Sequence, residues 1–187
     1  MTLNKLNPSD DRSLSPAERL LIADMKPIKN VFKRHAASEL YVAAPEDDRL
    51  YFHLTETTLT RPMMLSVSDN RWCAPLIAKK AGYVNRHYHP QEVTTFTVSG
   101  KWGYLEHDWV ARAGDFVYEP PGESHTLLAY ETEEPTVIYS DVKGPLIWLD
   151  DKGESAGYFD VFTFIEMAEA HYEKIGLGRD YVRQFFR

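Results

Sequence analysis

From about residue 38 to residue 148 the chain is a series of short runs rich in Val, Thr, Tyr, Phe and Trp, separated by Gly, Pro, Asp and Asn. β-Branched and aromatic residues favour strands, and the separating residues favour turns. Many short strands at close spacing predict an all-β core, a sandwich or barrel with antiparallel hairpins. The clearest runs are LYFHL, MMLSV, VTTFTV, WGYLEH, DFVYEP, HTLLAY and TVIYSDV.

Helical patterns flank this core on both sides. Ser15, Pro16 and Glu18 have the spacing of a capping box at the start of a short helix. Near the other end, FIEMAEAHYEKIG has apolar residues at helical spacing and RDYVRQFFR predicts a last short helix. The sequence therefore predicts three parts: an N-terminal arm with a short helix (1–37), one β domain (38–150) and a C-terminal helical tail (151–187).

Charge and composition exclude several classes of function. The 187 residues carry a formal net charge of −7, which argues against nucleic acid or an anionic membrane as a partner. No run of about 18 apolar residues predicts a transmembrane helix, and the N-terminus lacks the apolar core of a signal peptide. The single Cys73 lies in an apolar stretch and is interpreted as a small core residue. We expect a cytoplasmic protein.

Two histidines share one face of a predicted strand. His87 and His89 lie two residues apart, so both side chains leave a strand on the same side. Neutral imidazoles that face one cavity suit Zn, Cu, Ni or Fe(II). By contrast, His35, His53 and His171 stand alone in the pattern and are interpreted as surface or core residues.

Two stretches of the chain resemble the paired motifs of the cupin family. GYVNRHYHPQEVTTFTVSG, residues 82–100, resembles the first motif, with its HxH pair and flanking glycines. GDFVYEPPGESH, residues 114–125, resembles the second, with its glycine, Pro-x-Gly and final His125 in register. Ala129 stands where the family usually has Asn. The resemblance implies a single cupin jelly-roll domain in which His125 joins the HxH pair as a metal ligand.

The carboxylate of the first motif is displaced in this chain. The family's glutamate usually lies four or five residues beyond the second histidine, which here is Val93 or Thr94. Glu92 comes one position early. On an unbroken strand Glu92 therefore points away from the histidines, and only a bulge near Pro90 would turn it toward them.

A replacement carboxylate is predicted from the next strand. VSGK looks like a two-residue hairpin loop, and that register places Val93 opposite Glu106. Directly opposed residues of an antiparallel pair project from the same face, with Cβ atoms about 5 Å apart. The sequence thus favours Glu106 over Glu92 as the fourth metal ligand, with His107 as a third alternative.

The same register gives a predicted substrate pocket. It points Trp102 and Tyr104 inward as aromatic walls beside the metal, and Tyr88 and Glu119 are further candidates. For each of these residues a packing role stays open, because barrel cores are commonly aromatic.

A narrower resemblance suggests an activity. YLEHDWVARAGDFVYEPPGESHTL, together with the tail GLGRDYVRQFFR, is similar to the cupin group that contains 2,4′-dihydroxyacetophenone dioxygenase and acetylacetone-cleaving-like proteins. That group implies non-haem Fe(II) held by three His and one Glu, here His87, His89, His125 and Glu106. It also implies cleavage by O₂ of a carbon–carbon bond in a small aryl hydroxyketone or diketone.

Other functions remain open at this stage. A zinc-binding cupin that senses or binds a ligand without turnover is one alternative, and a metal-dependent isomerase is another, with Zn(II) or another divalent transition metal in the site. We also expect a homodimer or homotetramer, because Phe96 and Val98 form an apolar strip on the face opposite the histidines.

Overall fold

The computed structural model describes residues 15–21, 23–24, 35 and 39–187, which divide into a unit up to Glu46 and a unit from Asp47 to Arg187. In the first unit, helix α1 spans Pro16–Leu21. Its capping box is confirmed, because Ser15 N donates to Glu18 Oε2 at 2.6 Å and Glu18 N to Ser15 Oγ at 3.3 Å. The rest of the predicted arm lies largely outside the described residues.

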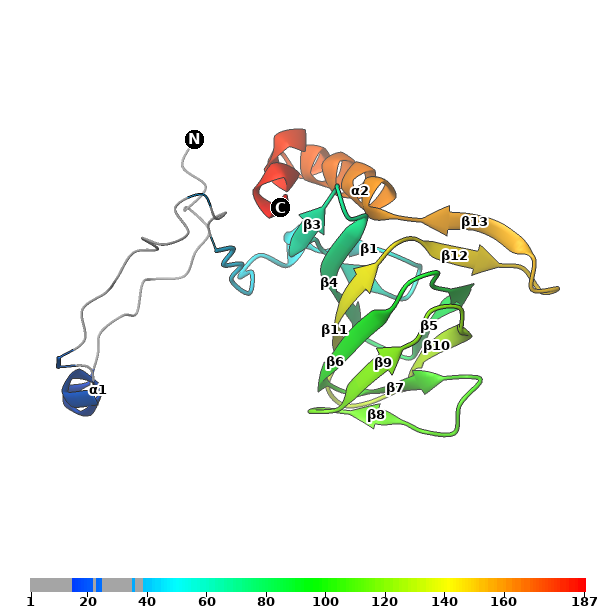
Figure 1. The fold of residues 1–187 in the computed structure, drawn as a ribbon, viewed down its shortest axis with the longest axis horizontal. Helices are drawn as coiled ribbons and strands as arrows, with labels where there is room; N and C mark the ends of the chain where they lie inside the picture. The colour runs from blue at the N-terminus through cyan, green and yellow to red at the C-terminus, as the bar shows by residue number, and fades with distance from the viewer. Residues whose placement is uncertain (1–14, 22, 25–34, 36–38) are drawn as a thin grey trace. The chain divides into compact units, whose positions relative to one another are not determined.

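Two antiparallel sheets form the second unit (Figure 1). One, sheet A, has the strand order β1-β2-β4-β11-β6-β9, with β3 also paired to β4; the other, sheet B, has the order β13-β12-β5-β10-β7-β8. The strands of sheet A are β1 (Phe52–His53), β2 (Leu59–Thr60), β3 (Met64–Ser66), β4 (Arg71–Ala78), β6 (Val93–Ser99), β9 (Phe116–Glu119) and β11 (Thr136–Lys143). Those of sheet B are β5 (Gly82–Tyr88), β7 (Lys101–Tyr104), β8 (Ala111–Arg112), β10 (Ser124–Ala129), β12 (Leu146–Leu149) and β13 (Ser155–Phe159).

The chain crosses repeatedly between the two sheets. From β4 onward it passes to β5, back to β6 and across again to β7, and from β9 it alternates sheets through β12. This alternation is the jelly-roll arrangement, so the predicted all-β cupin fold is confirmed. Each of the seven runs quoted from the sequence overlaps a strand.

One predicted hairpin is wrong. β6 ends at Ser99 and β7 begins at Lys101, but the two strands lie in different sheets and do not pair. Gly100, between them, has φ +74°, and a Cβ there would lie 2.3 Å from Thr136 Oγ1. The glycine therefore makes a close crossing from one sheet to the other, where the sequence alone suggested a tight turn within one sheet.

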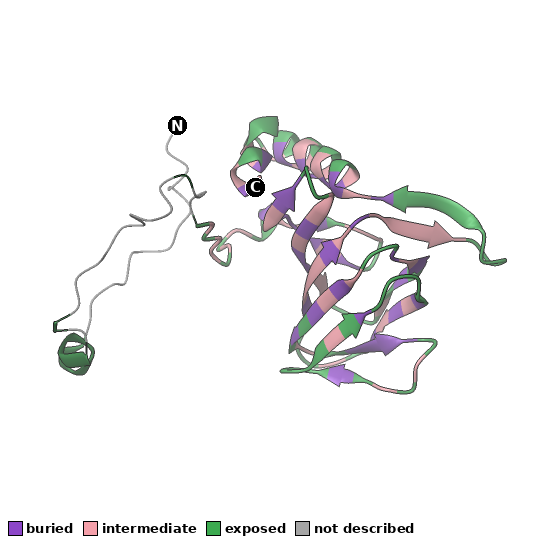
Figure 2. Cartoon of the chain, viewed as in Figure 1, coloured by how far each residue is buried: buried purple, intermediate pink, exposed green. Residues whose placement is uncertain are grey.

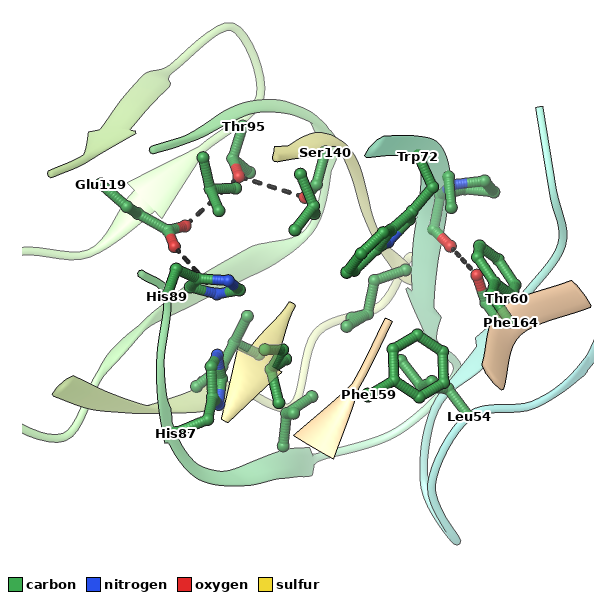
Figure 3. Close-up of a pocket in the computed structure, with 18 of the residues that line it drawn as sticks. Leu54, Thr60, Trp72, His87, His89, Thr95, Glu119, Ser140, Phe159 and Phe164 are labelled. Atoms are coloured by element: carbon green, nitrogen blue, oxygen red, sulfur yellow. Dashed lines mark hydrogen bonds and ion pairs between the residues drawn. The ribbon is translucent and has the colours of Figure 1, made fainter. Parts of the chain in front are cut away.

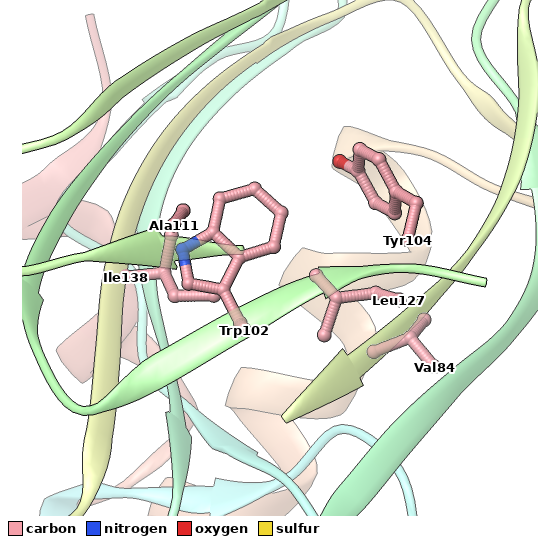
Figure 4. Close-up of a cluster of buried hydrophobic side chains, with 6 residues drawn as sticks. All are labelled: Val84, Trp102, Tyr104, Ala111, Leu127 and Ile138. Atoms are coloured by element: carbon pink, nitrogen blue, oxygen red, sulfur yellow. The ribbon is translucent and has the colours of Figure 1, made fainter. Parts of the chain in front are cut away.

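Apolar side chains fill the space between the sheets. Trp102 is fully buried, and its indole Nε1 donates to Thr97 Oγ1 at 2.8 Å. Around it lie the other members of one buried cluster (Figure 4): Val84, Tyr104, Ala111, Leu127 and Ile138. Strand β6 shows the alternation behind this packing, because Val93, Thr95 and Thr97 are buried while Phe96 and Val98 are exposed.

The C-terminal tail is helical from Val161 onward, as the sequence predicted. Its first part is not, because Ser155–Phe159 form strand β13 of sheet B, so the β domain extends beyond the predicted boundary at residue 150. Helix α2 (Val161–Lys174) begins at the N-cap Asp160, and the 3₁₀ helix η3 (Arg179–Phe185) follows. Phe164 of α2 packs edge-on against Phe52 and Trp72, so the helix closes one end of the sandwich. Among the described residues, no helix is long and apolar enough to cross a bilayer.

The outer face of β6 and β9 remains exposed in the single chain. Figure 2 shows the exposed segments of these strands, and Phe96, Val98, Phe116 and Tyr118 are each at least half exposed. The homo-oligomer expected from the sequence would cover Phe96 and Val98 on this face, and it stays a prediction.

Candidate metal centre

Three histidines meet between the two sheets. His87 lies near the end of β5, and His125 lies directly opposite it in the β5–β10 ladder. Opposed residues of an antiparallel pair project from the same face. His89 follows two residues after His87 and so points to the same side, which brings all three rings together.

The trio is tightly grouped and almost completely buried. One ring nitrogen from each of His87, His89 and His125 lies within 4.8 Å of the others, and no side chain is more than 5% exposed. The ring centroids are 4.7–5.7 Å apart. Among the described residues, this is the one group of three or more His, Cys, Asp or Glu side chains whose ligand atoms lie close enough together to hold a metal ion.

Burial keeps the three rings neutral at ordinary pH. Loss of hydration lowers the pKa of His87 to about 4, of His89 to about 2 and of His125 to about 3. The neighbouring histidines lower the pKa of His89 and His125 further. A neutral imidazole carries the lone pair that a metal ion requires.

The hydrogen bonds of the rings leave nitrogen atoms free for a ligand. His87 Nδ1 donates to the carbonyl of Asn85 at 2.6 Å, which fixes the ring and directs the lone pair of Nε2 elsewhere. His89 Nδ1 and His125 Nε2 are buried without a hydrogen-bond partner among the described residues. Buried polar atoms are rarely left unsatisfied, and a bound cation would satisfy them. The donor set therefore fits a divalent transition metal.

Glu119 is the carboxylate that faces this trio. Its Oε2 lies 3.6 Å from His89 Nε2 and 3.4 Å from His125 Nε2, and the residue is only 6% exposed. Figure 3 shows Glu119 beside His89, with a dashed line joining the two side chains. Glu119 lies at the end of β9, so the site draws its histidines from sheet B and its carboxylate from sheet A.

A hydrogen-bonded chain holds Glu119 in place. Tyr104 Oη donates to Glu119 Oε1 at 2.5 Å, and Thr95 Oγ1 donates to the same oxygen at 3.4 Å. Ser140 Oγ lies 3.1 Å from Thr95 Oγ1 and extends the chain across sheet A. Tyr104 also stacks on His125, with ring centroids 4.0 Å apart. One side chain thus fixes both the carboxylate and a histidine.

Burial dominates the electrostatics of this pair. It raises the pKa of Glu119 to about 7, against the lowering effect of the hydrogen bonds from Tyr104 and Thr95. It also raises the pKa of Tyr104 well above its ordinary value, and the charge of Glu119 adds to that rise. Tyr104 is therefore a permanent hydrogen-bond donor at neutral pH.

The structure places the other carboxylate candidates outside the trio. Glu92 pairs with Lys143, whose Nζ lies 2.5 Å from Glu92 Oε1. It lies in the connection between β5 and β6, which belong to different sheets, so the unbroken strand assumed from the sequence does not set its direction. Val93 is buried at the position of the family's glutamate. His107 pairs instead with Glu123, at 3.0 Å.

The structure does not place Glu106 among the histidines, although the sequence favoured it as the fourth metal ligand. Glu106 accepts hydrogen bonds from Thr126 N at 2.7 Å and Thr126 Oγ1 at 3.0 Å, and lies 3.8 Å from Arg86 Nε. Its charge reaches His87 through space, but its carboxylate is not part of the histidine cluster. The prediction failed because β6 and β7 do not form the hairpin that it assumed. In sheet A, Val93 pairs with Glu119 instead.

Two of the four predicted pocket residues reach the site. Tyr104 and Glu119 contact it directly, as described above. Trp102 is fully buried in the core cluster and lines neither of the spaces beside the histidines. Tyr88 is half-buried and lies between His87 and His89 along the chain, so it points to the opposite side of the strand.

Two spaces border the histidines. An inner cavity of about 90 Å³ lies between the sheets and is mostly apolar, with Trp72, Leu146, Trp148 and Phe159 in its wall. An outer cleft of about 460 Å³ lies on the other side of Glu119 and His125. His87 and His89 line the inner cavity, His125 lines the outer cleft, and Tyr104 and Glu119 line both.

Comparison with known families agrees with the fold and the site. A family model described as the ChrR cupin-like domain matches residues 41–146, more than half of the chain. The chain belongs to this cupin family. No curated protein matches the sequence.

Solved structures of cupins superpose on this member of the family. An RmlC-like cupin protein from Ralstonia eutropha JMP134 is 27% identical, with TM-score 0.61 over 65% of this chain and 78% of that one. The acetylacetone dioxygenase from Acinetobacter johnsonii is 20% identical, with TM-score 0.64 over 77% of this chain and 99% of that one. A cupin-like protein of unknown function, also from R. eutropha JMP134, is 20% identical, with TM-score 0.61 over 64% and 75%. The likeness to the last two shows the fold alone.

Proposed function

We propose that the protein is a non-haem Fe(II)-dependent dioxygenase that cleaves a carbon–carbon bond of a small hydroxyketone or diketone with O₂. The observation that carries the proposal is the buried trio of neutral histidines beside Glu119, in contact with a space large enough for a small molecule. The resemblance of the sequence to ketone-cleaving cupins and the shared fold with an acetylacetone dioxygenase support it.

His87, His89 and His125 would hold the metal, which supplies a Lewis acid and a centre for O₂ chemistry when bound. Three ligands leave coordination positions for substrate and O₂. A closed structural zinc site, in contrast, usually has four protein ligands and is often rich in thiolates. The donor set of this chain is therefore better suited to reaction than to a purely structural role.

Glu119 would move the proton of the reaction. A ketone must lose a proton from carbon or oxygen before its carbon–carbon bond can react with O₂. Glu119 Oε2 is the acceptor that lies beside the histidines, and Tyr104 fixes its position through Oε1. Thr95 supports the same oxygen, so the carboxylate is held before substrate arrives.

The apolar inner cavity would orient the substrate and exclude water. Its volume of about 90 Å³ is smaller than the roughly 150 Å³ of an engineered apolar cavity that binds benzene. An alkyl group fits there more readily than a substituted ring. Trp148, whose ring centroid lies 5.7 Å from that of His87, forms part of the wall nearest the site.

Oxygen uptake by iron-loaded protein tests the proposal. Protein loaded anaerobically with Fe(II) would be mixed with acetylacetone or 2,4′-dihydroxyacetophenone, and O₂ consumption and products would be followed. We expect one O₂ per ketone, with two carboxylic acids from the hydroxyketone, or one acid and a dicarbonyl from the diketone. His125→Ala is the matched inactive control.

The same experiment separates the alternatives. Stoichiometric zinc in the purified protein, without iron-dependent O₂ uptake across a panel of ketones, would favour a sensor or ligand-binding cupin. Conversion of a ketone without O₂ consumption would favour a metal-dependent isomerase. Either result would overturn the dioxygenase.

A further inference from the structure

The outer cleft opens along a seam between the two sheets. On one side lies β9, the edge strand of sheet A, and on the other lies the segment that joins β7 to β8 in sheet B. His107, Trp109 and Val110 line the cleft from that segment, and Phe116 and Tyr118 line it from β9. His125 and Glu119 also line the cleft, so it reaches the site at one histidine and at the carboxylate.

The cleft is acidic as well as aromatic. Asp115 and Glu123 line it beside Glu119, and no lysine or arginine stands among its lining residues in the described part of the chain. Glu123 pairs with His107, and Asp115 accepts a hydrogen bond from the backbone of Arg112. The backbone amide that Asp115 binds is neutral, so this contact leaves the charge of Asp115 in the cleft.

The inner cavity does not offer an equivalent route for a whole substrate. Its volume of about 90 Å³ is about one fifth of the outer cleft's 460 Å³. Its far side is lined by Trp72, Phe159 and Phe164, whose rings pack against one another with centroids 5.7–6.4 Å apart and narrow the space there (Figure 3). A ligand larger than a few heavy atoms that contacts His125 and Glu119 therefore has more room in the outer cleft than in the inner cavity.

We propose that ligands reach the histidine site through this seam, and that Asp115 and Glu123 restrict them to uncharged molecules by repelling carboxylates. The inference deepens the proposed function, on which it rests, since it names an uncharged ketone as substrate. The proposed reaction makes carboxylic acids, and the acidic side chains of the cleft would repel these carboxylates and favour product release.

Isosteric probes test the charge selection without turnover. Protein loaded with Co(II) would be titrated with lactamide and with lactate, which offer similar oxygen donors but differ in charge, and binding would be followed by visible absorption. The key variant is the double substitution Asp115→Asn with Glu123→Gln. Glu133→Gln with Glu134→Gln removes the same two charges from exposed positions outside the cleft and serves as the matched control.

The cleft variant should bind lactate about fivefold to tenfold more tightly than the wild type, because it removes the Coulomb repulsion of two carboxylates that line the same cleft. Its affinity for lactamide should not change, and the control variant should resemble the wild type. High salt should tighten lactate binding to the wild type by screening the same charges. If the cleft variant bound lactate and lactamide more tightly by the same factor, or if the control variant bound lactate as tightly as the cleft variant, the charge selection would be overturned.

A blocking substitution tests the route. Val110→Trp places a large ring in the cleft, while Val67→Trp changes a residue of equal exposure, 38%, outside it. Val110→Trp should weaken both probes by about tenfold or more at unchanged Co(II) content, and Val67→Trp should not. Unchanged binding to Val110→Trp would show that ligands enter elsewhere. Absent O₂ uptake with intact discrimination against lactate would refute the proposed dioxygenase and leave this inference standing.

Discussion

Val93 and Glu119 lie directly opposite each other in the β6–β9 ladder, and both side chains are buried. Because opposed residues share a face, the carboxylate enters the space beside the histidines at the level where β6 carries only an isopropyl group. The acid of this site therefore comes from β9, six residues before His125, and not from the strand that follows the HxH pair.

Glu119→Gln should lower ketone-dependent O₂ uptake by about a hundredfold or more, because an amide cannot accept the substrate's proton. The fold should persist, since the amide oxygen can still accept the hydrogen bond from Tyr104. Steady-state O₂ electrode measurements on Fe(II)-loaded protein, with iron content determined on the same samples, check this expectation.

Glu106→Gln is the matched control for that substitution, because Glu106 is the carboxylate that sequence reasoning preferred. It should retain nearly full O₂ uptake, since its contacts are with Thr126 and Arg86. A strong defect in Glu106→Gln with normal activity in Glu119→Gln would reverse the assignment of the two residues.

Tyr104→Phe should lower the free energy of unfolding by about 1–3 kcal/mol, because it removes the hydrogen-bond donor of a buried carboxyl group. It should also reduce O₂ uptake more than it reduces iron content, since Tyr104 positions Glu119 and His125 without contacting the metal. Urea unfolding and kinetic assays measure the two effects. Tyr158→Phe, on the exposed strand β13 and outside both spaces, should change neither; a similar loss there would rule out a specific role for Tyr104.

Metal-free protein should lose stability as the pH falls below about 6.5. The folded chain holds the pKa of each site histidine between about 2 and 4, whereas the unfolded chain takes up these protons near the ordinary value of 6.5. Protonation therefore favours unfolding, by on the order of 2 kcal/mol per histidine at pH 5. Glu119 acts in the opposite direction, because its raised pKa of about 7 favours the folded state as the pH falls from 7.

The effect of three histidines exceeds that of one carboxyl group. The free energy of unfolding of the metal-free protein should therefore fall by a few kcal/mol between pH 7 and pH 5. Urea midpoints of EDTA-treated protein measure it. His125→Gln should flatten the dependence, because glutamine does not titrate. Stability that is equal or greater at pH 5 in the wild type would contradict the burial of three neutral rings.

Cys73 should be nearly inert toward Ellman's reagent at pH 8 in the folded protein. Burial, with the nearby charge of Asp141, raises the pKa of its thiol from 9.0 to about 12. The thiolate fraction then falls about a thousandfold, and the thiolate is the reacting species. The same chain in concentrated urea is the control and should react at the ordinary rate. Rapid modification without denaturant would argue against the core interpretation of this cysteine.

The histidines and the fold were predictable because they depend on local spacing. The i, i+2 relation of His87 and His89 fixes their common face on any strand, and the two motifs place His125 on a neighbouring strand. The capping box at Ser15 and the end of helix α2 just before Gly176 are equally local, and the structure has both where the sequence indicated.

The carboxylate was not predictable in the same way, because it depends on which distant strands pair. Glu92 does point away from the histidines, but strand parity is not the reason: β5 ends at Tyr88 in sheet B and β6 begins at Val93 in sheet A, so the unbroken strand that the argument assumed does not form. The error came at Gly100, where a two-residue connection was interpreted as a hairpin, although the chain changes sheets there. Glu119 stood among the predicted pocket residues, and the jelly-roll pairing of β6 with β9 is what makes it the neighbour of the histidines.

Metal content of protein purified without chelator tests the central claim most directly. Elemental analysis of the wild type should give close to one transition-metal ion per chain, with iron supporting the proposed activity. His125→Ala should lose that metal, while His53→Ala, which changes an exposed histidine outside the site, should keep it. A wild-type protein without bound metal, or a His125→Ala variant that retains a full equivalent, would contradict a three-histidine metal centre.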